Sequence, residues 1–189
     1  MVRKKFTPTT MTTITADRLT AMTTTTSMGT KRRKPRILIA GLGNYLLQDD
    51  GVGVHAVRAL QQTPLPGVIV AEVGTAVLDA LHLLEWAEKI LAIDAMQAGG
   101  TPGTIYAFGV EDAAGPGMQA SLHELNLLAA LRFLPRQAKP QILIVGIEPE
   151  TIDYGLDLSP AVAAALPELS REVRRIVAGW RNGPRSPVK

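Results

Sequence analysis

The chain has 189 residues, of which 46% are hydrophobic and 20% are charged, and it contains no cysteine. This length suits one well-buried core. The longest uninterrupted apolar runs are strand-length, far below the roughly 18–20 residues that a membrane helix needs. Without cysteine there is no disulfide scaffold, thiolate metal site or cysteine nucleophile. We therefore expect a soluble, cytoplasmic protein that does not insert into a membrane.

The net charge of +3 hides two oppositely charged parts. Residues 1–36 carry nine of the 20 basic residues and one of the 17 acidic residues, a net charge of +8. The other 11 basic and 16 acidic residues give residues 37–189 a net charge of −5. Because the basic balance comes from one terminal segment, it does not indicate a nucleic-acid-binding surface. We expect no nucleic-acid partner.

Residues 1–35 are predicted to be a disordered leader. They are basic and rich in threonine, with few large apolar side chains and no hydrophobic period, so they cannot bury enough surface to offset the entropy of ordering. The composition is also similar to that of an organellar transit peptide, but we favour an extension without function. The basic segment 182–189, which contains Pro and Gly, is predicted to be a flexible tail.

Between these ends, apolar runs of strand length alternate with segments of helical period. Strands are predicted at 37–40, 68–71, 90–93, 103–110 and 141–146. Helices are predicted at 52–60, 78–86, 121–134 and from 160 onward, the last with Ser159 as N-cap and Pro160 in the first turn. This order predicts one α/β domain over residues 36–181, with a mostly parallel twisted sheet and helices on both faces.

Polar residues follow several of the predicted strands, where ligands gather in such sheets. Asp50, Glu72 and His123 offer two carboxylates and one imidazole from three separate strand ends. That set suits a divalent first-row cation. The alternative is that the two acids are hydrated loop residues and the histidine lies on a helix surface. Spacing alone does not decide between these interpretations.

The segment Gly41-Leu-Gly43 invites a comparison with dinucleotide-binding loops. The third glycine of that fingerprint is replaced by Leu46, and an acidic pair, Asp49 and Asp50, follows. A nucleotide- or nucleoside-handling α/β enzyme is therefore kept only as an alternative. The chain also lacks the His-Glu-x-x-His and Gly-x-Ser-x-Gly motifs of zinc proteases and α/β-hydrolases.

The glycine-rich segment belongs to a longer pattern. Five blocks occur in one order: 41–53, Glu72-Val-Gly-Thr75, Asp94-Ala95 with Pro102-Gly-Thr104, Ser121-Leu-His-Glu-Leu125, and Gly146-Ile-Glu-Pro149 with Gly155-Leu-Asp-Leu-Ser159. Together they resemble the signature of the hydrogenase maturation proteases over about residues 36–181. The resemblance implies an endopeptidase that removes the C-terminal extension of a nickel-loaded [NiFe]-hydrogenase large-subunit precursor.

The resemblance also implies roles for the three candidate ligands. Asp50, Glu72 and His123 fall on the metal-contacting positions of the family, where they act in catalysis as an aspartyl-type or metal-dependent site. The nickel is expected to be that of the substrate, and no organic cofactor is expected. Position 72 carries Glu in place of Asp, which shifts the carboxylate by one methylene. A non-catalytic assembly factor that senses the partner's metal through the same residues is the remaining alternative.

Overall fold

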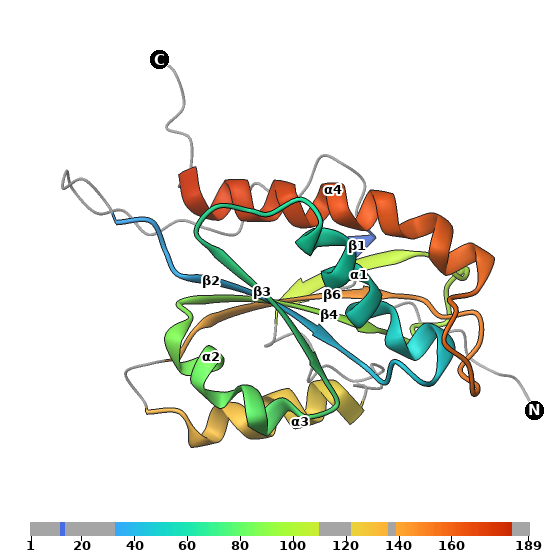
Figure 1. Cartoon of the computed structure of the whole chain (residues 1–189), viewed down its shortest axis with the longest axis horizontal. Helices are drawn as coiled ribbons and strands as arrows, with labels where there is room; N and C mark the ends of the chain where they lie inside the picture. The colour runs from blue at the N-terminus through green and yellow to red at the C-terminus, as the bar shows by residue number, and fades with distance from the viewer. Residues whose placement is uncertain (1–11, 14–32, 110–121, 136–138, 183–189) are drawn as a thin grey trace, which may run out of the picture.

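A twisted sheet lies at the centre of the computed structural model (Figure 1). The structure describes residues 12–13, 33–109, 122–135 and 139–182, with the backbone alone for residues 12–13 and 122–125. Its strands are β1 (Thr12–Thr13), β2 (Ile37–Leu42), β3 (Val68–Gly74), β4 (Lys89–Ala95), β5 (Ile105–Gly109) and β6 (Gln141–Ile147). In the described residues their order is β1-β5-β6-β4-β2-β3.

The four strands β6, β4, β2 and β3 run parallel, whereas β5 pairs with β6 in the antiparallel direction. The prediction of a mostly parallel sheet is therefore confirmed, and the antiparallel pair lies toward one edge. At the opposite edge, β3 has no further strand beside it in the part of the chain that the structure describes. The two leader residues of β1 pair with β5. The predicted boundaries of leader and tail stay predictions.

Two helices cover each face of the sheet (Figure 1). The first pair is α1 (Val52–Gln61) and α4 (Pro160–Asn182), and the second is α2 (Leu81–Trp86) and α3 (Leu122–Ala130). Alternate strand residues supply the two cores because successive side chains point to opposite faces. Ile37, Ile39 and Ile93 pack with α1 and α4 on one side. Leu38 and Ala92 pack with α2 and α3 on the other.

The predicted helices occur where expected, with differences at their ends. Residues 77–80 form a 3-10 turn before α2, so the helix predicted over 78–86 begins later. Helix α4 begins at Pro160 as predicted, and the backbone N–H of Val162 donates to Ser159 Oγ at 3.4 Å. Ser121, the first residue of the helix predicted over 121–134, lies outside the described residues. None of the described helices is both long enough and apolar enough to cross a bilayer.

Helix α1 lies unusually close to the sheet through two glycines. A Cβ atom added at Gly41 would lie 2.2 Å from the carbonyl oxygen of Gly53. One added at Gly53 would lie 2.2 Å from the carbonyl oxygen of Ile93 and 2.4 Å from that of Leu42. The backbones of the helix and of two strands are therefore in direct contact. Only glycine at these positions permits this approach.

We predict that Gly53→Ala destabilises the fold by about 2 kcal/mol or more, because the new methyl group meets backbone atoms that cannot move aside. The matched control is Gly179→Ala in α4, where an added Cβ meets nothing within 4 Å. That change is expected to stabilise the protein by about 0.5–1 kcal/mol, since alanine is the better helix former. Urea denaturation of the two variants measures both effects. Equal stability of the two variants would contradict the proposed contact.

Candidate active site at the carboxyl ends of the strands

The loop from β2 to α1 carries the predicted acidic pair. It includes a short 3-10 helix, Gln48–Gly51, in which Asp49 is fully buried and Asp50 is half-buried. The backbone N–H of Asn44 donates to Asp50 Oδ2 at 2.8 Å. Gly43 has φ of +103°, and a Cβ atom there would lie 1.8 Å from the backbone oxygen of Asp50. The loop therefore folds back on itself, with Asp50 held at its start.

Asp49 connects this loop to a distant segment of the chain. Its carboxylate accepts backbone N–H groups from Glu150 at 2.9 Å, Thr151 at 3.0 Å and Ser159 at 2.7 Å. Hydrogen bonds to an ionised carboxylate are among the stronger ones in proteins, and here they satisfy a group with no solvent exposure. Asp49 thus has a structural role.

Glu148 forms a second buried tether at the end of β6. Its carboxylate accepts the backbone N–H groups of Ala98 and Gly99 at 2.9 and 3.1 Å, and the hydroxyl of Tyr106 at 2.8 Å. Burial, followed by the hydrogen bond to Glu148, raises the pKa of Tyr106 to about 12. The tyrosine therefore stays protonated and donates to the carboxylate at neutral pH. This arrangement fixes the loop after β4, and sequence analysis assigned no role to Glu148.

Asp94 lies at the end of β4, next to β2 in the sheet. It is fully buried, and Oδ1 accepts the backbone N–H of Ala95 at 2.9 Å. The same oxygen lies 3.4 Å from the position that a Cβ atom would take at Gly43. The carboxylate of Asp94 therefore lies against the loop that carries Asp50. The adjacent strands β2 and β4 therefore bring Asp50 and Asp94 close together.

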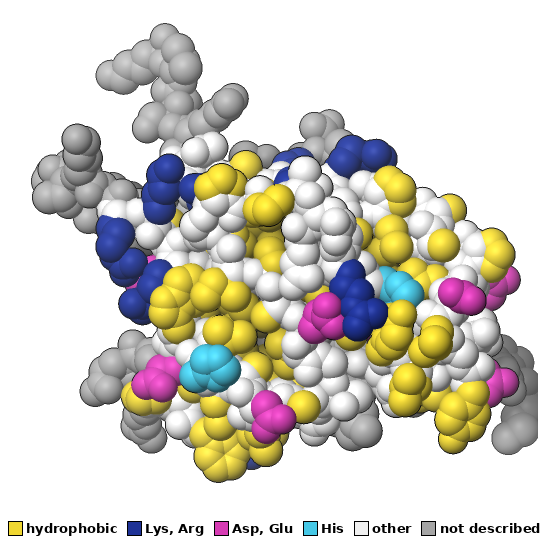
Figure 2. Space-filling model, in the orientation of Figure 1, with side chains coloured by type: hydrophobic (Ala, Val, Ile, Leu, Met, Phe, Trp, Pro, Cys, Tyr) yellow, Lys and Arg dark blue, Asp and Glu magenta, His cyan; other side chains and the backbone are white. Residues whose placement is uncertain are grey.

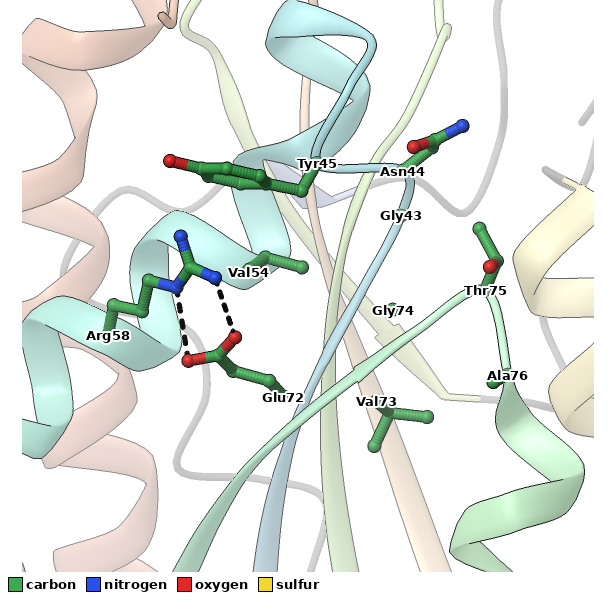
Figure 3. Close-up of a pocket in the computed structure, with 10 residues that line it drawn as sticks. All are labelled: Gly43, Asn44, Tyr45, Val54, Arg58, Glu72, Val73, Gly74, Thr75 and Ala76. Carbon is green, nitrogen blue, oxygen red and sulfur yellow. Dashed lines mark hydrogen bonds and ion pairs between the residues drawn. The ribbon is translucent and has the colours of Figure 1, made fainter. Parts of the chain in front are cut away.

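A pocket of about 350 Å³ opens beside this loop (Figure 3). Its lining comes from the β2–α1 loop, from α1 and from the end of β3: Gly43, Asn44, Tyr45, Val54, Arg58, Glu72, Val73, Gly74, Thr75 and Ala76. Glycines on two sides let the backbone form part of the wall, while valines give an apolar floor. The pocket therefore offers both main-chain groups and charged side chains to a ligand.

Glu72 forms an ion pair within this pocket. Arg58 donates from Nε and Nη2 to the two carboxylate oxygens at 3.0 and 2.9 Å (Figure 3). These hydrogen bonds raise the pKa of Arg58, and the guanidinium carbon lies 4.1 Å from the ring centroid of Tyr45. The two charged side chains are 43% and 38% exposed, so the pair contributes little to stability. Sequence analysis did not single out Tyr45 or Arg58.

The three predicted ligands thus come from the predicted elements. Asp50 lies in the loop after β2, Glu72 lies in the neighbouring strand β3 shortly before its end, and the backbone of His123 lies in the first turn of α3. The side chain of His123 lies outside what the structure describes. Among the side chains that the structure does describe, no three of His, Asp or Glu are grouped closely enough to hold a metal ion. The ligand set stays a prediction.

The other two histidines have different surroundings. His82 is exposed on α2. The ring of His55 lies 5.0 Å from that of Tyr45, and its Nε2 is 3.0 Å from the carbonyl oxygen of Leu156. His55 therefore joins α1 to the segment that Asp49 also holds.

The tether made by Asp49 is open to a direct test. We predict that Asp49→Asn destabilises the protein by about 2–3 kcal/mol, because the amide NH₂ turns a donor toward backbone N–H groups and leaves at least one of them unpaired. Asp153→Asn is the control, since Asp153 is an exposed acid of the same segment whose carboxylate, among the described residues, accepts the N–H of its neighbour Tyr154. Thermal or urea unfolding compares the two. Equal losses of stability would show that the buried hydrogen bonds of Asp49 stabilise the protein no more than the exposed one of Asp153.

Comparison with known proteins places this geometry in a family. The model of the hydrogenase maturation protease family matches residues 54–176. The hydrogenase expression/formation protein HupD of Rhodobacter capsulatus is 35% identical over 152 residues, which cover 77% of this chain and 72% of the relative. The hydrogenase 2 maturation protease of Escherichia coli is 33% identical over 140 residues, covering 69% of this chain and 84% of that protein.

Solved structures agree with the sequence comparison. The hydrogenase maturating endopeptidase HybD of Escherichia coli superposes with a TM-score of 0.67 at 27% identity, over 76% of this chain and 92% of that one. These similarities favour the endopeptidase over the nucleotide-handling and assembly-factor alternatives. The chain belongs to the hydrogenase maturation protease family and is an endopeptidase of that family's α/β fold.

Proposed function

We propose that this endopeptidase acts in the cytoplasm on a nickel-loaded [NiFe]-hydrogenase large-subunit precursor and removes its C-terminal extension. The observation that supports this most directly is the placement of Asp50 and Asp94. Asp94 lies near the carboxyl end of β4 and Asp50 in the loop after the adjacent parallel strand β2; both approach Gly43, which lines the open pocket. A protease that recognises a metal-loaded substrate needs acidic groups at a surface that the substrate polypeptide can reach.

The nickel is proposed to be part of the substrate. Carboxylate oxygens and an imidazole suit a borderline divalent ion, and Asp50 with His123 would supply one of each. A nickel ion already held by the precursor needs only a few ligands from the protease. Its contact would orient the scissile segment in the site, which is a large part of catalysis by positioning.

Two carboxylates compete for the third position. Glu72 is the predicted ligand, but both of its oxygens accept hydrogen bonds from Arg58. A metal ion would have to compete with the guanidinium for them. Asp94 is fully buried and lies against the Gly43–Asp50 loop, near the end of the strand next to β2. We therefore propose Asp94 as the third contact and Glu72 as a pocket residue.

Hydrolysis itself requires that a water molecule lose a proton as it attacks the scissile carbonyl. We propose that a carboxylate of this site accepts that proton, as general bases do in many hydrolases, and returns it to the leaving nitrogen when the C–N bond breaks. Asp50 is the half-buried member of the pair and Asp94 the fully buried one. Asp50 is therefore the better placed to meet substrate and water. Asp94, as a proposed nickel contact, would help to orient the substrate.

The nickel requirement can be tested on the substrate. Nickel-loaded and nickel-free precursors are incubated with metal-stripped protease, and release of the C-terminal peptide is followed by mass spectrometry. We expect release from the loaded precursor alone, because the metal-free form lacks the contact that positions the scissile segment. Equal release from both forms would exclude the checkpoint and favour a protease that carries its own ion.

Single substitutions test the residues. We expect Asp50→Asn, Asp94→Asn and His123→Ala each to lower kcat/KM for the loaded precursor by roughly 100-fold or more, as expected when a general base or a positioning ligand is removed. His82→Ala is the control, because His82 is exposed on α2 away from the pocket lining. Glu72→Gln decides the third position. A loss as large as that of His123→Ala, with Asp94→Asn nearly silent, would restore Glu72 as the ligand.

A further inference from the structure

We propose that the open edge of β3 binds the extended segment of the precursor as an added strand and lays the scissile bond across the pocket. This inference rests on the proposed function, because it takes the precursor as the ligand. It concerns how the polypeptide is held, which the roles of Asp50, Asp94 and His123 do not explain. The recognition would be made by backbone groups of the protease.

In the part of the chain that the structure describes, no strand pairs with the outer edge of β3 where it approaches the site. Within the described chain β3 ends the sheet, with β2 as its single neighbour. Two contacts show which residues point outward: the N–H of Val68 donates to the carbonyl of Leu65, and the side-chain amide of Gln61 donates to the carbonyl of Val70. Because successive residues of a strand alternate, Glu72 also directs its backbone N–H and C=O away from β2.

Helix α1 covers only the first part of this edge. Gln61, its last residue, donates a side-chain hydrogen bond to the carbonyl of Val70 and so occupies that outward-facing acceptor. Beyond it the strand continues through Glu72 to Gly74, which has φ of +58° and ends the strand. Figure 3 shows β3 running past the sticks of Glu72 and Val73 into the pocket wall at Thr75. The open stretch of backbone and the pocket are therefore continuous.

The same stretch is adjacent to the acidic site. Glu72 pairs in the sheet with Gly41, and Gly74 pairs with Leu42, directly before the Gly43 turn. Asn44 lines the pocket and donates its N–H to Asp50. A polypeptide bound along residues 72–74 would thus pass over the loop that carries Asp50. Unpaired strand edges bind extended peptides through main-chain hydrogen bonds, with neighbouring pockets selecting side chains.

The precursor fits this edge better than a second copy of the chain does. The uncovered part of β3 offers few outward-facing residues, since Gln61 blocks the strand from Val70 backward. Two such short edges would bury far less area than a stable dimer needs. A protease substrate needs only a short extended contact, provided that the acidic site lies next to it. The continuity of edge, pocket and Asp50 loop supplies that condition.

Hydrogen exchange tests the proposed contact directly. Nickel-loaded precursor is added to the Asp50→Asn variant, in which turnover is slow, and amide exchange is followed by mass spectrometry. We expect amides of the segment 72–76 to exchange about tenfold more slowly with precursor than without it. Amides of α4, on the far side of α1, serve as the internal control and should not change.

A pair of substitutions at one position separates backbone from side chain. Glu72→Pro removes the outward N–H, whereas Glu72→Gln keeps it and removes only the charge. We expect KM for the loaded precursor to be about tenfold higher for Glu72→Pro than for Glu72→Gln, the effect of one lost hydrogen bond. Proline is tolerated at an edge whose N–H faces outward, and a melting curve of each variant confirms folding. If the proline variant does not fold, the exchange experiment decides alone.

Two results would overturn the inference. One is slower amide exchange only in the segment that contains the exposed apolar residues Ile152, Tyr154 and Leu156, with the exchange of amides 72–76 unchanged. The other is protection of 72–76 that appears without precursor and rises with protein concentration, which would assign the edge to a second copy. If wild-type protein releases no peptide from loaded precursor, the proposed function fails. Release without protection of β3 removes this inference alone.

Discussion

The direct backbone contact between α1 and the sheet is the constraint on which the site depends. Gly41 and Gly53 remove the two side chains that would otherwise separate helix and strands. The close approach forces the intervening chain into a tight turn, so that Asp49 and Asp50 are brought back over the end of β2. It also brings Arg58 of α1 within reach of β3, where the guanidinium donates to both carboxylate oxygens of Glu72.

Two buried carboxylates then fasten the loops around the site. Asp49 holds the segment after β6, and Glu148 holds the loop after β4. Each uses backbone N–H groups as partners, so the bonds do not depend on the side chains of the tethered segments. A buried charge is tolerated only when it is fully hydrogen-bonded. Both acids sit where the parallel strands end, and there they organise main chain that has no regular structure.

The secondary structure was largely predictable because apolar runs and helical periods are local properties of the sequence. The strands at 37–42 and 141–147 and the Pro160 start of α4 follow directly from such patterns. The strand order and the antiparallel direction of β5 were not predictable. They depend on which buried faces meet, and no single segment contains that information.

The site was predictable in part. The residue types at the strand ends and the family signature led to Asp50, whose loop lines the pocket through Gly43, Asn44 and Tyr45 and whose role stays a prediction. The ion pair of Glu72 with Arg58 was hidden, because residues 14 positions apart on a helix and a strand show no pattern in sequence. The different surroundings of Asp49, Asp50 and Asp94 were equally hidden. All three are aspartates at or after strand ends, and only burial and hydrogen bonding identify Asp49 as a tether.

The Asp49 tether has a consequence for synthesis on the ribosome. Its three partners lie 101, 102 and 110 residues further along the chain. At roughly 5–20 residues per second, that interval takes on the order of ten seconds to translate. Throughout this time a nascent chain has made its acidic loop but not the segment that encloses Asp49. The loop that carries Asp50 is therefore enclosed late, after the strands of the described sheet have been translated.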